Sequence, residues 1–327
     1  MDTIFGKLRA AFTACATLIF VCHAAAAYPE KPIRVILPYS PGGGGDLILR
    51  TIQPLLEKRL GQPIVVEYKP GAGGNIGAGE VARAAPDGYT LLLGATNNFV
   101  INQFLFPRMG FDPLQAFAPI SLVVEQPYLV MVSSQTGAND YREFSKFAKA
   151  NAGKLNYGSP GAGTVPQISA LMLSQHLGAD MVHVPYRGSQ PALVALAAND
   201  VQLLIASYGI VAGQMSKGKI RALAVAADSR LESLPDVPTA AEVGVPPGIL
   251  LSNWWGLVAP RGTDEAIVQR IARELRAVVK DVQTQNKLAQ QGSIVVANEP
   301  EDFAKRIRTE AREWKAIIDK TGVKLDN

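Results

Sequence analysis

Short apolar runs alternate with segments of helical periodicity in the part of the chain that follows the N-terminal segment. Residues 33–37, 64–67 and 90–94 are strand-length runs of mostly apolar residues, which is typical of strands buried on both faces of a sheet. Between these runs, residues 47–60 carry apolar positions at helical spacing, and residues 76–84 form a helix of small residues. Three successive strand–helix units predict an α/β domain with a mostly parallel sheet.

A long apolar stretch, residues 120–132, separates this first α/β unit from a second one and is broken at Glu125-Gln126-Pro127. We interpret the stretch as a crossover between two domains. After this stretch we expect six helices, at residues 140–150, 166–176, 190–199, 239–243, 264–291 and 300–321. We also expect five strands, at residues 155–157, 181–188 (including the turn that ends it), 201–206, 220–226 and 253–260.

A run of four glycines follows the first strand, within residues 38–46, and a helix is expected to begin at its end. Glycine leaves backbone N–H groups unshielded, and a helix N-terminus adds unpaired N–H groups and partial positive charge, so the arrangement suits an anion. Taken alone, the run is also explained as a tight turn between a strand and a helix. A second loop of the same type, residues 158–164, precedes the helix at Pro166. The chain is thus predicted to contain two anion-binding loops, one on each side of the crossover.

The N-terminal segment has the pattern of a secretory signal peptide. Lys7 and Arg9 precede an apolar run, residues 10–22, that leads to Ala25-Ala26-Ala27. Crossing a bilayer takes about 20 apolar residues, so we predict cleavage after Ala27 rather than a membrane anchor. Both cysteines lie in the apolar run, and the mature chain is therefore expected to contain no disulfide.

The formal net charge of the 327-residue chain is +4, without a block of like charges. This balance is too mild to indicate a nucleic-acid partner, and it is compatible with a small anionic ligand.

Residues suited to catalysis are few. The predicted mature chain contains His176 and His183 but no nucleophile or metal motif of the usual spacings, and we interpret His183 as a core histidine with a hydrogen-bond partner. Residues 77–82 fit the loose glycine fingerprint of dinucleotide-binding domains. However, no strand runs directly into them and no acidic residue lies about 20 positions later. The sequence therefore predicts a protein that is not an enzyme and that takes no cofactor and no metal.

Seven short motifs, in this order and spacing, carry a family resemblance. They are PYSPGGGGD at 38–46, PGAGGNIG at 70–77, PDGYTLL at 86–92, FAPISL at 117–122, VPYRG at 184–188, VPTAAE at 237–242 and WGLVAP at 255–260. Together they make the chain, from Tyr28 to its C-terminus, similar to the Bug family of periplasmic solute-binding proteins, the receptors of tripartite tricarboxylate transporters.

The resemblance implies the type II periplasmic binding protein fold, in which each of two α/β domains is a mostly parallel sheet flanked by helices and the ligand cleft lies between them. Domain I would comprise residues 28–125 and 253–327, and domain II residues 126–252, with the C-terminal helices packed back on domain I. The implied protein is a periplasmic monomer whose partners are a small carboxylate ligand and integral membrane permease subunits.

The resemblance also implies the residues that bind the ligand. Those expected in the first glycine loop are Tyr39, Ser40, Gly42, Gly43, Gly44 and Asp46. Those expected to follow the third strand are Thr96, Asn97 and Asn98, and those expected in the second domain are Ser159, Gly163, Thr164, Tyr186 and Ser207.

Departures from the family pattern bear on the ligand. The family often has Asn at the position of Tyr68, His at that of Gln167, and Asp-like residues at those of Gln202 and Ala206. These differences remove ionisable groups near the cleft edge of the second domain, so we expect a dicarboxylate or an aromatic acid rather than an acidic amino acid.

The function expected from these observations is that of an extracytoplasmic receptor, which captures a small carboxylate and delivers it to a tripartite tricarboxylate transporter. Two alternatives stay open from the sequence. One is a ligand sensor that presents a bound carboxylate to a membrane signalling protein, and the other is a dinucleotide-dependent enzyme.

Overall fold

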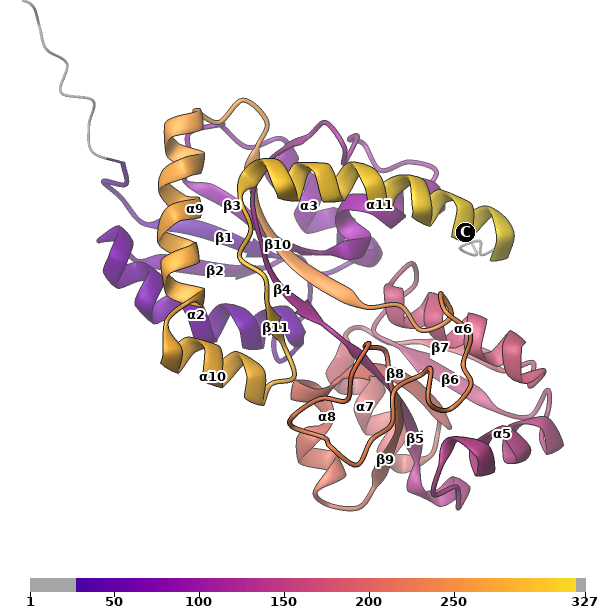
Figure 1. Ribbon diagram of the computed structural model, residues 1–327. Coiled ribbons are helices and arrows are strands. Elements are labelled where there is room, and N and C mark those ends of the chain that lie inside the picture. The colour runs from indigo at the N-terminus through magenta and orange to yellow at the C-terminus, as the bar shows by residue number, and fades with distance from the viewer. Residues whose placement is uncertain (1–27, 322–327) are drawn as a thin grey trace, which may run out of the picture. The chain divides into compact units, whose positions relative to one another are not determined.

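The computed structural model describes residues 28–321, so the predicted signal peptide and its cleavage site lie outside the described residues. Residues 31–321 belong to one compact unit. This unit contains two β-sheets with helices packed on them (Figure 1).

The first sheet has the strand order β11-β4-β10-β3-β1-β2. Its strands are β1 (Ile33–Leu37), β2 (Ile64–Tyr68), β3 (Thr90–Ala95), β4 (Phe117–Gln126), β10 (Asn253–Pro260) and β11 (Ile294–Val295). The strands β1, β2 and β3 pair parallel, as the strand–helix alternation predicted. The strand β10 returns from the second sheet and pairs antiparallel with both β3 and β4, which makes the sheet mixed.

The second sheet has the order β7-β6-β8-β5-β9 and is mixed as well. Its strands are β5 (Tyr128–Ser133), β6 (Asn156–Ser159), β7 (Val182–Pro185), β8 (Leu203–Ser207) and β9 (Ile220–Val225). The strand β6 pairs parallel with β7 and β8, whereas β5 pairs antiparallel with β8 and β9. The antiparallel part arises because β5 follows β4 after a single intervening residue, Pro127, and enters the second sheet directly.

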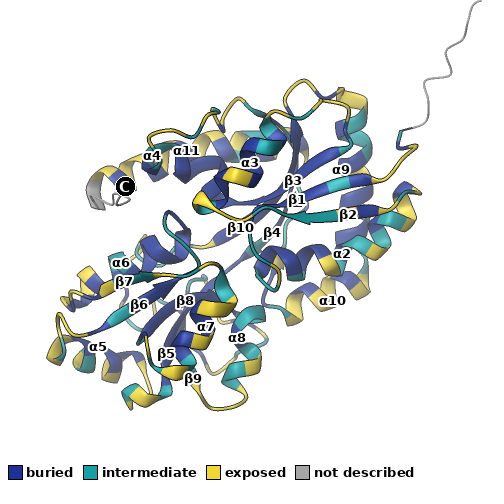
Figure 2. Cartoon of the chain, turned by 180° about the vertical axis from the view of Figure 1, so that it is seen from behind, coloured by how far each residue is buried: buried dark blue, intermediate teal, exposed yellow. Residues whose placement is uncertain are grey.

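Helices pack on both sheets. On the first sheet they are α2 (Gly44–Leu60), α3 (Asn75–Ala82), α4 (Asn102–Leu105), α9 (Glu265–Val279), α10 (Val282–Gln290) and α11 (Pro300–Thr321); on the second they are α5 (Tyr141–Ala150), α6 (Val165–Leu177), α7 (Ser189–Ala198) and α8 (Tyr208–Met215). Of the C-terminal helices, α9 and α11 both contact β4, so they pack back on the first sheet. Buried positions follow the strands and the sheet-facing sides of the helices (Figure 2).

Two expected helices differ from the structure. The helix expected over 264–291 is two helices, because the Asp281 carboxylate accepts the N–H of Thr284 and begins α10 separately. No helix forms at 239–243; the Thr239 and Glu242 pair bonds as a helix start would, but the chain turns at Gly244, whose φ is +78°. The structure also contains elements that were not expected, which include the helix α8 directly after β8, the short helix α4 and the short strand β11.

Candidate functional site

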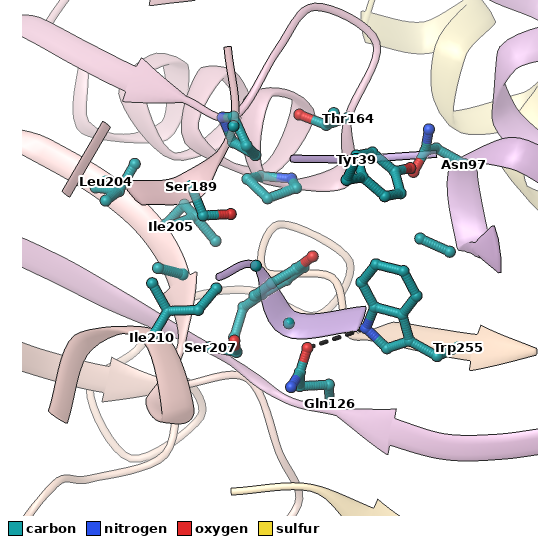
Figure 3. Close-up of a pocket in the computed structure, with 18 of the residues that line it drawn as sticks. Tyr39, Asn97, Gln126, Thr164, Ser189, Leu204, Ile205, Ser207, Ile210 and Trp255 are labelled. Carbon is teal, nitrogen blue, oxygen red and sulfur yellow. Dashed lines mark hydrogen bonds between the residues drawn. The ribbon is translucent and has the colours of Figure 1, made fainter. Parts of the chain in front are cut away.

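A small cavity of about 50 Å³ is lined by residues from both sheets (Figure 3). On the same measure one water molecule needs about 10–15 Å³, so the cavity suits a small molecule. Its lining residues are Tyr39, Ser40, Gly43, Gly44, Ala95, Asn97, Gln126, Tyr128, Pro160, Thr164, Pro166, Gly188, Ser189, Leu204, Ile205, Ala206, Ser207, Ile210 and Trp255.

Four helices of the described chain begin at this cavity. Their N-caps are Gly43 of α2, Thr164 of α6, Gly188 of α7 and Ser207 of α8, and all four residues line it. None of these four caps makes a side-chain hydrogen bond to its own helix. The first N–H groups of a helix lack partners within the helix and carry partial positive charge. The cavity can therefore stabilise an anion through backbone dipoles.

The side chains that line the cavity are neutral. Among its described lining residues there is no Asp, Glu, Lys, Arg or His. The polar groups that remain are hydroxyls, amides and the indole N–H of Trp255, and the rest of the wall is apolar, with both aliphatic side chains and aromatic rings. Such a wall offers hydrogen-bond donors to an anion but no carboxylate to a cation.

An amide network fixes Tyr39 at the end of β1. Its hydroxyl donates to Asn97 Oδ1 at 2.7 Å and lies 3.0 Å from Asn98 Oδ1. The Asn97 and Asn98 amides in turn donate to the carbonyl of Gly73, at 2.7 and 3.1 Å. Burial raises the pKa of the Tyr39 hydroxyl, and the two amides offset this only in part, so the side chain stays neutral. Asn97 begins a π-helical turn (Asn97–Ile101), a rare conformation that is frequent at functional sites.

Close packing explains two glycines of the first loop. A Cβ on Gly44 would come within 2.5 Å of Gln126 Oε1, and a Cβ on Gly45 within 2.4 Å of the Trp255 ring. Trp255 in turn donates from Nε1 to Gln126 Oε1 at 3.1 Å and packs edge-on against Tyr39, with ring centroids 5.5 Å apart. The start of α2 can approach this aromatic wall only because the side chains are missing.

A larger pocket, of about 560 Å³, adjoins the cavity and shares Tyr39, Ser40, Pro160, Thr164 and Gly188 with it. Its remaining walls come from Pro38, from Phe106 and from the loop residues 70–74, 161–162 and 185–187.

The structure brings many of the predicted site residues together. Those that line the cavity are Tyr39, Ser40, Gly43, Gly44, Asn97, Thr164 and Ser207, and Tyr186 lines the adjoining pocket. Gly42, Asp46, Thr96, Asn98, Ser159 and Gly163 line neither of the two.

The predicted residues outside the lining make internal hydrogen bonds that position it. In the first sheet, the Asp46 carboxylate accepts the N–H of Gly42 at 2.8 Å, and Thr96 Oγ1 accepts the N–H of Trp254 at 2.9 Å. In the second, the N–H of Gly163 donates to Gln167 Oε1 at 2.6 Å. Ser159 Oγ lies 2.8 Å from His183 Nε2.

Several lining residues were not predicted from the sequence. Gln126 and Tyr128 flank the proline that breaks the apolar stretch 120–132, and this break could have indicated them. Ile205 and Ile210 gave no such signal, because one lies in an apolar strand and the other in a helix that was not expected.

The four departures from the family pattern lie in different places. Ala206 lines the cavity, whereas Tyr68, Gln167 and Gln202 do not. The Tyr68 hydroxyl donates to Asp46 at 2.7 Å, and Gln202 bonds to the backbone of Asn156 at the far end of β6. The expectation about the ligand thus depends on Ala206 alone among the four.

Features suited to other functions do not converge on this cavity. His183 has Ser159 and Gln167 as its neighbours and is half-buried rather than in the core. Within residues 28–321 no three His, Cys, Asp or Glu residues lie close enough to hold a metal ion. The helices described here include none that is both long and apolar enough to cross a membrane.

Comparison with known proteins shows what the chain resembles. The family model described as "Tripartite tricarboxylate transporter family receptor" matches residues 48–323. The structure of the periplasmic binding protein BugD is 33% identical, with a TM-score of 0.86 over 91% of this chain and 100% of that one. MatC from Rhodopseudomonas palustris, with bound malate, is 33% identical, with a TM-score of 0.83 over 89% of this chain and 100% of that one.

A third solved structure, R. palustris Rpa4515 with adipate, is 29% identical, with a TM-score of 0.87 over 91% of this chain and 100% of that one. These relatives are periplasmic binding proteins rather than enzymes, and their fold has the two helix-flanked sheets found in this chain. The chain belongs to the family of tripartite tricarboxylate transporter receptors, which includes the Bug proteins.

Proposed function

We propose that the protein binds a small carboxylate in the cavity and delivers it to the permease of a tripartite tricarboxylate transporter. The observation that supports this most directly is the convergence of four helix N-termini, without capping side chains, on a cavity with neutral walls. Backbone N–H groups and hydroxyls that meet there form charge-assisted hydrogen bonds with a carboxylate.

The relatives support the ligand class, since MatC was solved with malate and Rpa4515 with adipate. The residues that line the cavity narrow the ligand class further. Ala206 lies at a position where the family often has an acidic residue, and no described lining residue offers a carboxylate to an ammonium group of a ligand. The ligand is therefore a dicarboxylate or an aromatic acid rather than an acidic amino acid.

Hydrogen bonds at such a site are sufficient for micromolar affinity for a carboxylate. A hydrogen bond to a charged group contributes about 1.5–3 kcal/mol, and a micromolar complex needs about 8 kcal/mol after the costs of association. A handful of bonds to the helix N-termini and hydroxyls is enough.

To deliver the ligand to a permease, the protein must be exported to the periplasm and must be able to release the bound ligand. Within this proposal, residues 1–27 are removed on export to the periplasm, and residues 28–125 with 253–327 form one domain and 126–252 the other. The chain passes between the two sheets at Pro127 and again between β9 and β10, and these two segments would act as the hinge.

A thermal-shift screen with malate, adipate, benzoate and aspartate, followed by calorimetry, tests the ligand class. We expect stabilisation by the dicarboxylates or the aromatic acid. No stabilisation by any acid would contradict carboxylate binding, and tighter binding of aspartate than of dicarboxylates would contradict the proposed ligand class.

The start of α2 is tested with Gly43→Val. A Cβ at Gly43 would meet Ser40 O at 3.5 Å, an ordinary contact, and the extended backbone there (φ −82°, ψ 175°) accepts a branched residue. The added methyl groups shield the N–H groups, so we expect affinity for the acid to fall at least about tenfold. Gly213→Val is the matched control, because Gly213 lies exposed in α8 with open space at its Cβ position, and it should bind like wild type. If Gly43→Val binds the acid with unchanged affinity, the N-terminus of α2 does not bind the carboxylate.

A further inference from the structure

The hydroxyl of Ser207 is not used by the protein itself. Ser207 is the N-cap of α8, with the extended backbone typical of a cap (φ −81°, ψ 153°). A serine at this position usually accepts an N–H bond from the first turn of its helix. Here it makes no such bond: the residue is fully buried, and Oγ has no hydrogen-bond partner within residues 28–321. Because Ser207 lines the cavity, this hydroxyl is available to a ligand there.

A second hydroxyl lies beside it. Tyr128 of β5 is directly opposite Ser207 of β8 in the antiparallel register, which places both side chains on the same face. Tyr128 also lines the cavity and is 8% exposed, and its hydroxyl makes no hydrogen bond to any residue that the structure describes. The Tyr39 hydroxyl differs, since it is already bonded to Asn97.

The surroundings of this pair favour an anion. Ile205 and Ile210 form apolar walls next to Ser207, and the first turn of α8 directs partial positive charge toward the cavity. One N–H of that turn, of Gly209, is bonded to Gln291 O at 3.0 Å and is therefore not available to a ligand. In Figure 3, Ser207 and Ile210 lie on the opposite side of the pocket from Tyr39 and Asn97.

We infer that Ser207, Tyr128 and the α8 N-terminus form a subsite for the second carboxylate of a dicarboxylate whose first carboxylate lies at the α2 N-terminus. This inference rests on the proposed function and narrows its ligand class. According to this inference, the selectivity for dicarboxylates over monocarboxylates comes from two neutral hydroxyls and not from a cationic side chain. An aromatic monocarboxylate would leave both hydroxyls buried without a partner, which is unfavourable.

The experiment compares matched pairs of acids by calorimetry. Linear dicarboxylates from malonate to adipate are each paired with the monocarboxylate of the same carbon number, and the tightest pair is used. Wild type should bind the dicarboxylate more tightly. Ser207→Ala should weaken dicarboxylate binding about tenfold to hundredfold and leave monocarboxylate binding nearly unchanged. Tyr128→Phe should act in the same direction. Ser216→Ala, at the C-cap of the same helix and with its Oγ bonded to Gly213 O, should leave both affinities unchanged.

A second measurement separates this role from helix capping. Without ligand, the thermal midpoint of Ser207→Ala should be no lower than that of wild type, because the hydroxyl makes no cap bond. A lower midpoint together with equal losses for both acids would overturn the inference and make Ser207 a structural cap.

Other results of the calorimetry distinguish a failure of the inference from a failure of the proposed function. If the half-amide of the preferred dicarboxylate binds as tightly as the diacid, the subsite does not select a carboxylate and the inference is overturned. Binding of both acids by wild type with no differential loss in Ser207→Ala overturns the inference but leaves the proposed function standing. If wild type binds no acid, the proposed function fails and the inference fails with it.

Discussion

At the residue scale, Asp46 shows how a residue outside the cavity determines the geometry of its wall. Its side chain is 4% exposed and accepts bonds from the Gly42 N–H at 2.8 Å, the Tyr68 hydroxyl at 2.7 Å and Arg50 Nε at 2.9 Å. Burial alone raises the pKa of the Asp46 carboxyl, but these bonds outweigh it and hold the pKa below its ordinary value. The carboxylate thereby closes the glycine turn that presents the start of α2 to the cavity.

The shift predicts a pH-dependent contribution to stability. Because the pKa of Asp46 is lower in the folded than in the unfolded chain, its contribution is fully present above the unfolded value of about 3.9 and is lost as the pH falls through the folded value. Asp46→Asn should lower the free energy of unfolding by about 1–3 kcal/mol at pH 7, with a difference from wild type that shrinks toward pH 2. Urea denaturation between pH 2 and 7 measures this, with Asp319→Asn, at an exposed ion pair, as the control. A difference that does not change with pH would contradict the assignment.

At the element scale, local patterns predicted most of the strands and helices but not all of their ends. The apolar runs of β1 and β3 and the periodicity of α9 are signals within a few residues, so they were visible in the sequence. The division between α9 and α10 was missed, because helical periodicity continues across Asp281 while its side chain ends one helix and caps the next. The helix α8 was missed because it follows the apolar strand β8 directly, with no loop between Ser207 and Tyr208.

The cap at Asp281 gives a test at this scale. Asp281→Ala removes the acceptor for the Thr284 N–H at 3.0 Å and the Thr284 hydroxyl at 3.2 Å, so we expect the free energy of unfolding to fall by about 0.5–2 kcal/mol. Thermal denaturation measures the loss. Asp228→Ala, in the non-helical segment after β9, should be nearly neutral. Equal effects of the two changes would mean that the cap does not stabilise α10.

At the scale of the whole molecule, the cavity results from contacts that no local pattern contains. Tyr128 and Ser207 meet through a strand register that joins positions far apart in the chain. The two glycine loops were visible in the sequence, and Gly43 and Thr164 both line the cavity, but their distance from Ser207 is set by how two sheets pack. Side-chain bonds also connect the first glycine loop to residues 187–190 beside the cavity, a region that we call the mouth. Ser40 Oγ donates to Arg187 O at 3.2 Å, and Gln190 Nε2 donates to Gly42 O at 2.9 Å.

These contacts at the mouth predict how ligand binding and domain closure are coupled. If the ligand stabilises the arrangement in which both sheets line the cavity, X-ray scattering should show a smaller radius of gyration with saturating dicarboxylate than without it. Gln190→Ala removes one contact specific to that arrangement, so we expect the dissociation constant to rise about two- to tenfold. The higher dissociation constant should result mainly from faster ligand release, because the bond from Gln190 to Gly42 stabilises the closed arrangement. Gln135→Ala, at an exposed glutamine away from the mouth, should behave like wild type. Unchanged scattering with ligand, or a Gln190→Ala effect confined to the association rate, would contradict closure around the ligand.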